Sequence, residues 1–264
     1  MKKYNIIGDT HGRTHWERLV REDSTNIFVG DYFDPYENIP FDKLKENFEH
    51  ILWFARTHTD TILLLGNHDL HYLHHEPGGS RKDWSHEKEI EKLFLSNMYL
   101  FEGMAFAISK DILVSHAGVT KEWLEKTEYT GTPGNAYEIA SHVNNIFWDG
   151  YTEHPDGISD WGERPWETGL GKFQFGYGAT SWGDVYGTSP DQSPAWIRPT
   201  TLIKPSHNGL PNGKQIVGHT QAKAIIPDAH PHIIIVDTLG QDFIASLIVE
   251  HEDGNDVFKV NQIQ

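Results

Sequence analysis

The sequence contains no cysteine. This absence excludes disulfides, thiolate nucleophiles and zinc sites with thiolate ligands. The sequence also has no apolar window as long as a membrane-spanning helix requires. The N-terminus, MKKYNIIGDT, has two lysines but too short an apolar stretch before Asp9 to be a signal peptide. We therefore expect a protein that does not enter a membrane and that acts in the cytoplasm.

Positive charge is scarce as well. The chain has 22 Lys and Arg against 38 Asp and Glu, which gives a formal net charge of −16. Proteins that bind duplex nucleic acid normally present a basic stripe to the phosphates, so this balance argues against such a partner. Bound cations could still make one site locally positive inside an acidic shell.

Three short apolar runs in the first half of the chain are each closed by glycine, at residues 4–8, 26–30 and 62–66. Their length and aliphatic content predict strands. After Pro40, apolar residues recur on one helical face, at Phe41, Leu44, Phe48, Ile51, Leu52 and Ala55. This alternation of strand and helix predicts an α/β fold with a largely parallel sheet covered on both faces.

Further elements are expected in the rest of the chain. Residues 85–98 predict an amphipathic helix with Ser85 as its N-cap, and residues 105–118 predict two strands around a turn at Lys110–Asp111. Four C-terminal apolar runs, with no long helix between them, predict a second, mostly antiparallel sheet. No clear linker divides the chain, so we expect a single domain over residues 1–264.

Residues 148–200 differ from the rest of the sequence. They contain five of the nine tryptophans and nine glycines, with no clear period, and we expect an irregular insert. Its aromatic content argues against disorder. The insert could be a lid whose rings stack on substrate, or a small satellite core that holds a long loop in place.

Side chains that can bind metals follow the apolar runs at five places. Ligands of open α/β sheets bind beyond the carboxyl ends of the strands, where all of these residues are expected. Oxygen and imidazole donors without sulfur suit Mn²⁺, Fe or Zn²⁺. One such motif is common by chance, but five in this order are not. They are Asp9 and His11 in GDTHG, Asp31 and Asp34 in GDYFD, Asn67 and His68 in GNHD, His116 in SHAG, and His219 in GHT.

Together these motifs resemble those of the calcineurin-like metallophosphoesterases. The resemblance implies a four-layer α/β/β/α sandwich of two mixed β-sheets flanked by helices, with two divalent metal ions at the rim. Mn²⁺ is the first choice of ion, and Fe, Zn or Ni are alternatives. The segment GHTQ lacks the last histidine of Gly-His-x-His, as in the phosphoprotein-phosphatase-like bacterial branch. The implied ligands are Asp9 and His11 for one ion, Asn67, His116 and His219 for the other, and Asp31 as a bridge.

The same resemblance implies that His68 is the general acid and that Asp34 orients it. A histidine in this role needs a carboxylate partner to fix its tautomer and stabilise its charged form. Asp69 is the rival partner, but adjacent side chains point in different directions, which favours Asp34. The implied mechanism is attack on phosphorus by a hydroxide that bridges the metals, without a phosphoenzyme.

The sequence departs from the family at the arginine that binds the substrate phosphate. Phosphoprotein phosphatases usually place an arginine after the GDxxD motif, whereas here Pro35 and Tyr36 follow. Arg198, in AWIRP, resembles a Trp-x-Arg-Pro segment of bacterial phosphatases and dinucleoside polyphosphate hydrolases; otherwise it is a surface residue beside a packed tryptophan. Arg164 and the histidines after Asp69 are further candidates. His71, His74 and His75 are otherwise interpreted as loop histidines rather than a third metal site.

Three functions follow. The first is a phosphoesterase that acts on a small phosphorylated molecule, a nucleotide or a phosphoprotein. The second is a dinucleoside polyphosphate hydrolase, which the Trp-x-Arg-Pro segment and the aromatic insert suggest. The third is a binding scaffold without catalysis, which loss of ligands or of the acid would mark, and none is lost. A nuclease is disfavoured by the acidic charge and the missing last histidine.

Overall fold

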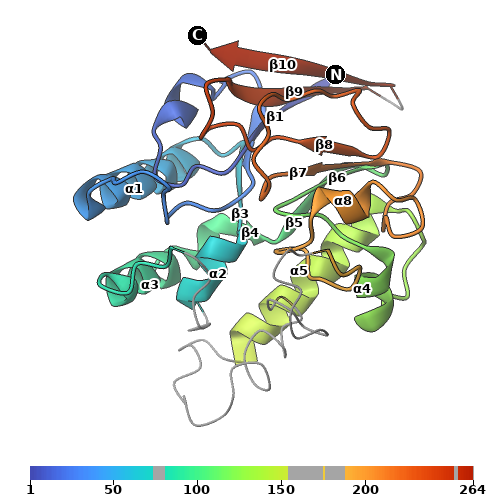
Figure 1. The fold of residues 1–264 in the computed structure, drawn as a ribbon, viewed down its shortest axis with the longest axis horizontal. Helices are drawn as coiled ribbons and strands as arrows, with labels where there is room; N and C mark the ends of the chain where they lie inside the picture. Colours follow the sequence, from blue (N-terminus) through green and yellow to red (C-terminus); the bar gives the residue numbers. More distant parts are fainter. Residues whose placement is uncertain (74–80, 154–174, 176–187, 253–254, 264) are drawn as a thin grey trace.

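The computed structural model describes residues 1–73, 81–153, 175, 188–252 and 255–263. Two sheets face each other, with helices on their outer sides (Figure 1). The larger sheet has the order β10-β9-β1-β2-β3-β4. Its strands are β1 (Lys2–Ile7), β2 (Thr25–Phe28), β3 (Thr61–Leu64), β4 (Phe101–Gly103), β9 (Ile244–Glu252) and β10 (Asn255–Ile263).

The smaller sheet has the order β5-β6-β7-β8. In it, β5 and β6 form an antiparallel pair around the turn that the sequence predicts, whereas β6, β7 and β8 run parallel. In the larger sheet, β1 to β4 are parallel as well. The strands of the smaller sheet are β5 (Ala105–Ser109), β6 (Ile112–Ser115), β7 (Lys214–Val217) and β8 (Ile233–Ile235).

The expectation that the C-terminal strands form a mostly antiparallel sheet of their own is wrong. β7 pairs in parallel with β6, and β8 pairs in parallel with β7, because residues 218–232 between β7 and β8 are long enough to return the chain to the same end of the sheet. β9 instead pairs antiparallel with β1, and β10 with β9. This pairing satisfies the outer edge of β1, whose backbone groups would otherwise lack partners.

Helices form the two outer layers. α1 and α3 pack on the larger sheet, and α5 packs along β5, where the Asn144 side chain accepts hydrogen bonds from the backbone N–H groups of Met104 and Ala105. The fold is therefore the four-layer α/β/β/α sandwich. The helices are η1 (His15–Arg18), α1 (Phe41–Thr57), α2 (Asn67–Leu73), α3 (Glu87–Leu95), η2 (Met98–Leu100), α4 (Lys121–Lys126), α5 (Ala136–Glu153) and α8 (Pro199–Leu202).

The alternation of side chains along the strands separates two cores. Ile6 and Ile27 lie between the sheets, in one buried cluster with Val114, Ile216 and Ile234 of the smaller sheet. Their neighbours in sequence, Ile7 and Phe28, lie in the other cluster, against the helices. The strands are thus buried on both faces, as their unbroken apolar sequences predict.

The helix expected over residues 85–98 is shorter than predicted. α3 begins after His86, so Ser85 is not its N-cap. Asp83 instead holds the residues before the helix in a turn, because its Oδ1 accepts hydrogen bonds from the backbone N–H groups of Ser85 and His86. Met98 belongs to η2.

The segment that the sequence marks as an irregular insert begins inside a helix, since residues 148–153 are the last turns of α5. Trp148 donates its indole N–H to the carbonyl of Glu102, and Phe175 is fully buried between Trp123 and Phe147. These aromatic residues belong to the larger core cluster or pack against it, and do not form a separate satellite core. Trp161, Trp166 and Trp182 lie outside the described residues.

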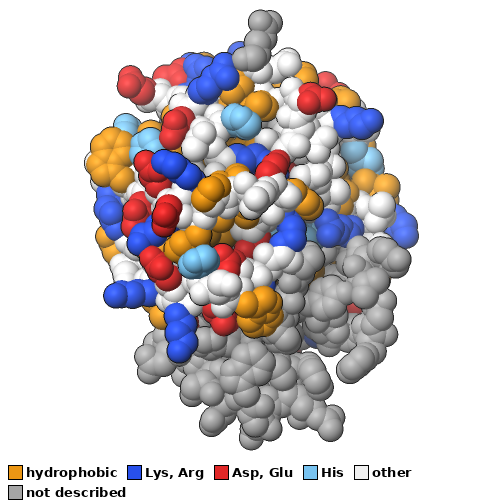
Figure 2. Space-filling model, turned by 60° about the vertical axis from the view of Figure 1, so that its left-hand side comes forward, with side chains coloured by type: hydrophobic (Ala, Val, Ile, Leu, Met, Phe, Trp, Pro, Cys, Tyr) orange, Lys and Arg blue, Asp and Glu red, His pale blue; other side chains and the backbone are white. Residues whose placement is uncertain are grey.

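No helix in the described residues is long and apolar enough to cross a membrane. On the face that Figure 2 shows, acidic and basic side chains are interspersed over the described surface, without a continuous basic stripe. That duplex nucleic acid is not a partner stays a prediction. The cytoplasmic location stays a prediction.

Candidate active site

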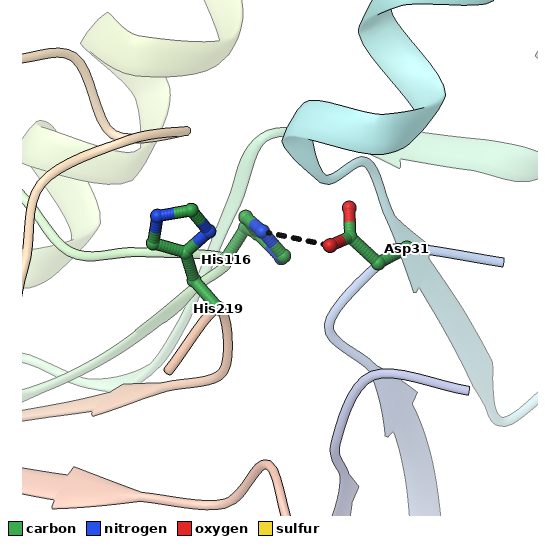
Figure 3. Close-up of side chains that lie close together, drawn as sticks. All are labelled: Asp31, His116 and His219. Carbon is green, nitrogen blue, oxygen red and sulfur yellow. Dashed lines mark ion pairs between the residues drawn. The ribbon is translucent and has the colours of Figure 1, made fainter. Parts of the chain in front are cut away.

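The carboxyl ends of β1, β2 and β3 of one sheet and of β6 and β7 of the other meet at one rim. The loops that leave these ends carry the six predicted metal ligands, and five of them are at most 3% exposed. Figure 3 shows His116, at the end of β6, between Asp31 of the larger sheet and His219 from the loop after β7. Among the predicted ligands, two groups have ligand atoms within 4.8 Å of one another: Asp9, His11 and Asp31, and Asp31, His116 and His219. Asp34, His68 and His71 form a third group that meets the same criterion.

Asp31 is common to both groups. Its Oδ2 lies 3.6 Å from Nε2 of His11 and 3.5 Å from Nε2 of His116. Asn67 completes the second group, because its Oδ1 lies 2.9 Å from both Nε2 of His116 and Nδ1 of His219. The structure thus brings together all six residues that the sequence predicts as ligands.

Each of the three histidines has one ring nitrogen on a backbone carbonyl. Nδ1 of His11 lies 2.7 Å from the carbonyl oxygen of Phe33, and Nδ1 of His116 lies 2.9 Å from that of Val29. Nε2 of His219 lies 3.2 Å from the carbonyl of Trp196. A carbonyl can only accept, so these nitrogens carry the hydrogen and the other nitrogen of each ring presents a lone pair to the site.

Burial keeps the three imidazoles neutral. Desolvation lowers the pKa of His11 to about 4, although the charge of Asp31 opposes this shift. Desolvation also lowers the pKa of His116, and it lowers that of His219 well below its usual value. Neutral histidine is the form that binds metal ions, so no proton has to be displaced.

The buried acidic residues of the site shift one another's pKa. Burial, and then the charges of Asp237 and Asp31, raise the pKa of Asp9 well above its usual value. Asp237 follows β8, and burial together with the charge of Asp31 raises its pKa to about 7. The pKa of Asp31 is lowered instead, because the electrostatic interactions of its carboxylate with the neighbouring imidazoles outweigh its burial.

Backbone strain is concentrated at this rim. Six residues other than glycine have positive φ in the described part of the chain, and five of them belong to the site or border it. Such conformations cost on the order of 1–3 kcal/mol each for residues other than glycine, and they cluster at functional sites. The five are His11 (φ 44°), Asp31 (56°), Asp34 (59°), Arg81 (73°) and His219 (60°).

Two of the glycines that close the strands allow the close approach of the ligands. A Cβ at Gly66 would lie 2.2 Å from Oδ1 of Asp31, and a Cβ at Gly218 would lie 2.1 Å from Oδ1 of Asp9. Any larger residue would push these carboxylates out of place. Glycine before Asn67 and before His219 is therefore a requirement of the site.

The residues fit divalent metal ions. Oδ1 of Asp9 is buried and has no hydrogen-bond donor among the described residues. Around it lie further acidic oxygens, an amide oxygen and three imidazole lone pairs, a donor set that suits Mn²⁺, Fe or Zn²⁺. Cations at the two groups would neutralise the acidic cluster that raises the pKa of Asp9 and Asp237.

Next to the metal groups lies a second network centred on Asp34. Nδ1 of His68 lies 2.8 Å and Nε2 of His71 lies 2.7 Å from Oδ2 of Asp34, while the hydroxyl of Tyr72 donates to Oδ1 at 2.5 Å. His68 contacts Asp34 and not its neighbour Asp69. The network links to the metal groups because the backbone N–H of His68 donates to Oδ1 of Asp31 at 2.9 Å.

The side chain of Asp69 points away from His68, toward the backbone of the loops after β2 and β3. Its carboxylate accepts hydrogen bonds from the backbone N–H groups of Asp31 at 2.8 Å, Tyr32 at 3.0 Å and Gly66 at 2.8 Å. It therefore connects the loop after β2 with the loop after β3 and holds the backbone of Asp31 in its strained conformation.

Two arginines lie at the site. Arg198 is half-buried, and its Nη1 donates to the carbonyl of His219 at 2.8 Å and to Oγ1 of Thr220 at 3.0 Å. Trp196, two residues earlier, packs edge-on against the His219 ring. Nη2 of Arg81 lies 3.0 Å from Nε2 of His68. Arg164 lies outside the described residues.

Sequence reasoning missed several of these residues. His71 is not a loop histidine, because it lies in α2, is fully buried and contacts Asp34. Its spacing of three residues from His68, on one helical face, was the available signal. Asp237 could have been found as the first polar residue after the apolar run of β8. Arg81 carried no sequence signal. His74 and His75 lie outside the described residues.

A four-layer sandwich with paired Asp and His clusters beyond its parallel strands defines a metal-binding α/β protein. The sequence matches the model of the calcineurin-like phosphoesterases over residues 3–165, more than half of the chain. The chain belongs to this family. It is accordingly a hydrolase of phosphate esters, of a family that depends on metal ions, and its Asp and His clusters could bind such ions.

Solved structures of phosphatases share the fold. A cold-active protein-tyrosine phosphatase of the psychrophile Shewanella sp. is 17% identical with a TM-score of 0.58, and the match covers 100% of this chain and 81% of that one. A Saccharomyces cerevisiae structure described as a protein serine/threonine phosphatase is 15% identical with a TM-score of 0.53, covering 100% and 80%. A search of curated proteins found no match.

Proposed function

We propose that this protein is a metal-dependent phosphatase for monoesters of a small molecule or a phosphoprotein, with His68 as the general acid. The observation that carries the proposal is the position of His68. Its ring contacts Asp34, and its backbone N–H is bonded to Asp31, which belongs to both metal groups. A proton donor is thus fixed beside the two groups that would hold the ions and the phosphate.

Two divalent ions are proposed, with Mn²⁺ as the first choice and Fe, Zn or Ni as alternatives. Asp9 and His11 would hold one ion, Asn67, His116 and His219 the other, and Asp31 both. When bound, the ions supply a hydroxide nucleophile near neutral pH and neutralise the phosphate oxygens.

Asp34 prepares His68 for proton donation. Despite burial, hydrogen bonds from His68 and His71 lower the pKa of Asp34 to about 2, so its carboxylate is charged at neutral pH. The carboxylate accepts the hydrogen of Nδ1, orients the ring and stabilises the imidazolium. Nε2 then faces away from Asp34 and gives its proton to the leaving oxygen.

Arg198 is proposed to bind phosphate oxygens that do not contact metal. Its guanidinium has five N–H donors, of which the contacts with His219 and Thr220 use Nη1 alone. The charges of Asp9 and Asp31 act on it, so it lies within the field of the metal groups. The alternative is a structural role in which Arg198 only fixes the loop of His219.

A second candidate is a dinucleoside polyphosphate hydrolase. The observation that favours it is Tyr36, which is 60% exposed, with its ring edge-on to the ring of His11 at 5.7 Å between centroids. An exposed aromatic ring beside a phosphate site can stack on a nucleobase. The Trp-x-Arg-Pro segment that ends at Pro199 points the same way.

Turnover of a substrate panel with Mn²⁺ tests both candidates. The panel holds an aryl phosphate, a bis-aryl phosphate, a phosphopeptide and a dinucleoside polyphosphate, with chelator-treated protein and His68→Ala protein as controls. We expect metal-dependent release of phosphate from the aryl phosphate or the phosphopeptide. Turnover of the dinucleoside polyphosphate alone would select the second candidate, and no turnover of any substrate would reject both.

A further inference from the structure

We propose that Arg81 is a phosphate-binding residue that supplies the guanidinium absent after Asp34. The inference rests on the proposed phosphatase function. Arg81 comes from the segment between α2 and α3, far in sequence from the position where an arginine is expected. The structure nevertheless brings it to the same corner of the site.

Three contacts hold the guanidinium there. Nη1 donates to the backbone carbonyl of Asp34, and Nη2 lies 3.0 Å from Nε2 of His68. The guanidinium carbon lies 3.6 Å from the centroid of the Tyr36 ring, a stacking contact that arginine makes more readily than lysine. Arg81 therefore touches the general acid itself, on the nitrogen that must face the leaving group.

The segment that carries Arg81 is tied to the same network. The backbone N–H of Asp83 donates to the hydroxyl of Tyr72 at 2.9 Å, and that hydroxyl in turn donates to Asp34. Lys82 pairs with Glu87 at the start of α3. These bonds fix the backbone of the residues that follow Arg81. The Arg81 side chain therefore extends to the site from an ordered segment.

The backbone of Arg81 is strained. Its φ of 73° lies in the left-handed region, which residues other than Gly, Asn and Asp rarely adopt. Glycine would occupy this position without the cost, which is on the order of 1–3 kcal/mol. The Arg81 side chain therefore reaches the site from a backbone conformation that glycine would adopt without strain.

The two arginines lie on different sides of the metal groups. Arg81 contacts His68, and its positive charge helps to lower the pKa of His11. Arg198 contacts the loop of His219 and acts on His116 and His219. A phosphate above the metal groups would lie between two guanidiniums, and their N–H groups match its oxygens in pairs.

The test compares Arg81→Gly and Arg81→Lys with the wild type, all loaded with Mn²⁺. Arg21→Ala is the control, because it removes one positive charge at the amino end of β2, where Arg21 pairs with Asp23. Calorimetry gives the affinity for inorganic phosphate, and kinetics with an aryl phosphate give KM and kcat. Metal content and the melting temperature are measured for each protein.

We expect Arg81→Gly to weaken phosphate binding and raise KM roughly 10- to 100-fold, the loss of one or two charge-assisted hydrogen bonds. Arg81→Lys should recover little, because an ammonium group cannot make the paired hydrogen bonds of a planar guanidinium. The melting temperature of Arg81→Gly should not fall, since glycine relieves the strain. Millimolar guanidinium ion should partly restore kcat/KM of Arg81→Gly but not change Arg21→Ala.

Unchanged phosphate affinity in Arg81→Gly would overturn the proposal, as would a lower melting temperature and metal content without rescue by guanidinium, which would show a structural role. Phosphatase activity in the wild type together with either result would leave the proposed function intact. If the wild type hydrolyses no ester, the proposed function fails, and the comparison of phosphate affinities still decides the role of Arg81.

Discussion

The backbone N–H of His219 donates a hydrogen bond to Oδ2 of Asp9 at 2.9 Å, although 210 residues separate the two along the chain. The bond joins the loop after β7 of one sheet to the loop after β1 of the other. Each residue is proposed to bind a different metal ion. The two halves of the site are therefore coupled through protein atoms, and the consequences of removing one ligand differ with its position.

Asp31→Asn should lose more metal than any other single ligand variant. Asp31 lies within 3.6 Å of both His11 and His116, and the substitution replaces one of its two oxygens by a group that cannot bind metal. We expect a large loss of both ions, whereas Asp9→Asn and His219→Ala should chiefly lose one. Elemental analysis after gel filtration gives the ratio of metal to protein. Two tightly held ions in Asp31→Asn would contradict the bridging role.

His68→Ala should keep the fold and both ions but turn over more slowly. General acids contribute on the order of 10²–10⁴-fold to the rate. The defect should be small for a nitrophenyl phosphate, whose leaving group needs little protonation, and large for an alkyl phosphate. Steady-state kinetics on the two esters provide the comparison. Equal defects on both would rule out His68 as the acid.

Asp34→Asn should change the kinetics, whereas Asp69→Asn should lower the stability of the fold. Asp34 contacts the His68 ring, so its variant should resemble His68→Ala in its dependence on the leaving group. Asp69 accepts three backbone hydrogen bonds, so Asp69→Asn should lower the free energy of unfolding by about 1–3 kcal/mol. Urea denaturation and kinetics measure the two effects. The reverse assignment of effects would show that Asp69 is the partner of His68.

His71 should make the metal-free protein less stable in acid. Burial lowers its pKa in the folded state, where Asp34, His68 and Lys82 surround it, while the unfolded value is about 6.5. Below that pH the unfolded chain binds more protons than the folded one, so the free energy of unfolding falls as the pH falls.

The comparison is with His71→Gln, which cannot titrate. The stability difference between wild type and variant should shrink between about pH 7 and pH 5, by at most about 1.4 kcal/mol per pH unit. Urea denaturation of chelator-treated protein at several pH values gives this difference. A constant difference over that range would mean that His71 does not titrate on unfolding.

Arg198→Ala should weaken the binding of substrate and inorganic phosphate and leave the metal content unchanged, and Arg198→Lys should recover little. If Arg198 is only structural, its removal should be nearly silent in kinetics. Trp196→Ala, which loses the contact with the His219 ring, should then lower the melting temperature instead. Inhibition by inorganic phosphate separates the two cases, since wild-type inhibition in Arg198→Ala would reject the phosphate contact.

Local patterns in the sequence determined the strands that carry the site. Apolar runs closed by glycine predict β1, β2 and β3, and the polar residues that follow them predict where ligands gather, because the carboxyl ends of parallel strands meet at one edge. The six ligand candidates do lie together in the structure. The reason is that both the strand and the residue after it are encoded within a few positions of each other.

The tertiary structure decided what depends on partners distant in sequence. β9 joins the first sheet because the edge of β1 lacks a partner, which no pattern within β9 itself reveals. Asp237 reaches Asp9, and Arg81 reaches His68, only through the way the chain returns over both sheets. Arg81 has no strand, period or motif to mark it. Its role depends on a position in space that packing fixes, and packing is not a local property of the sequence.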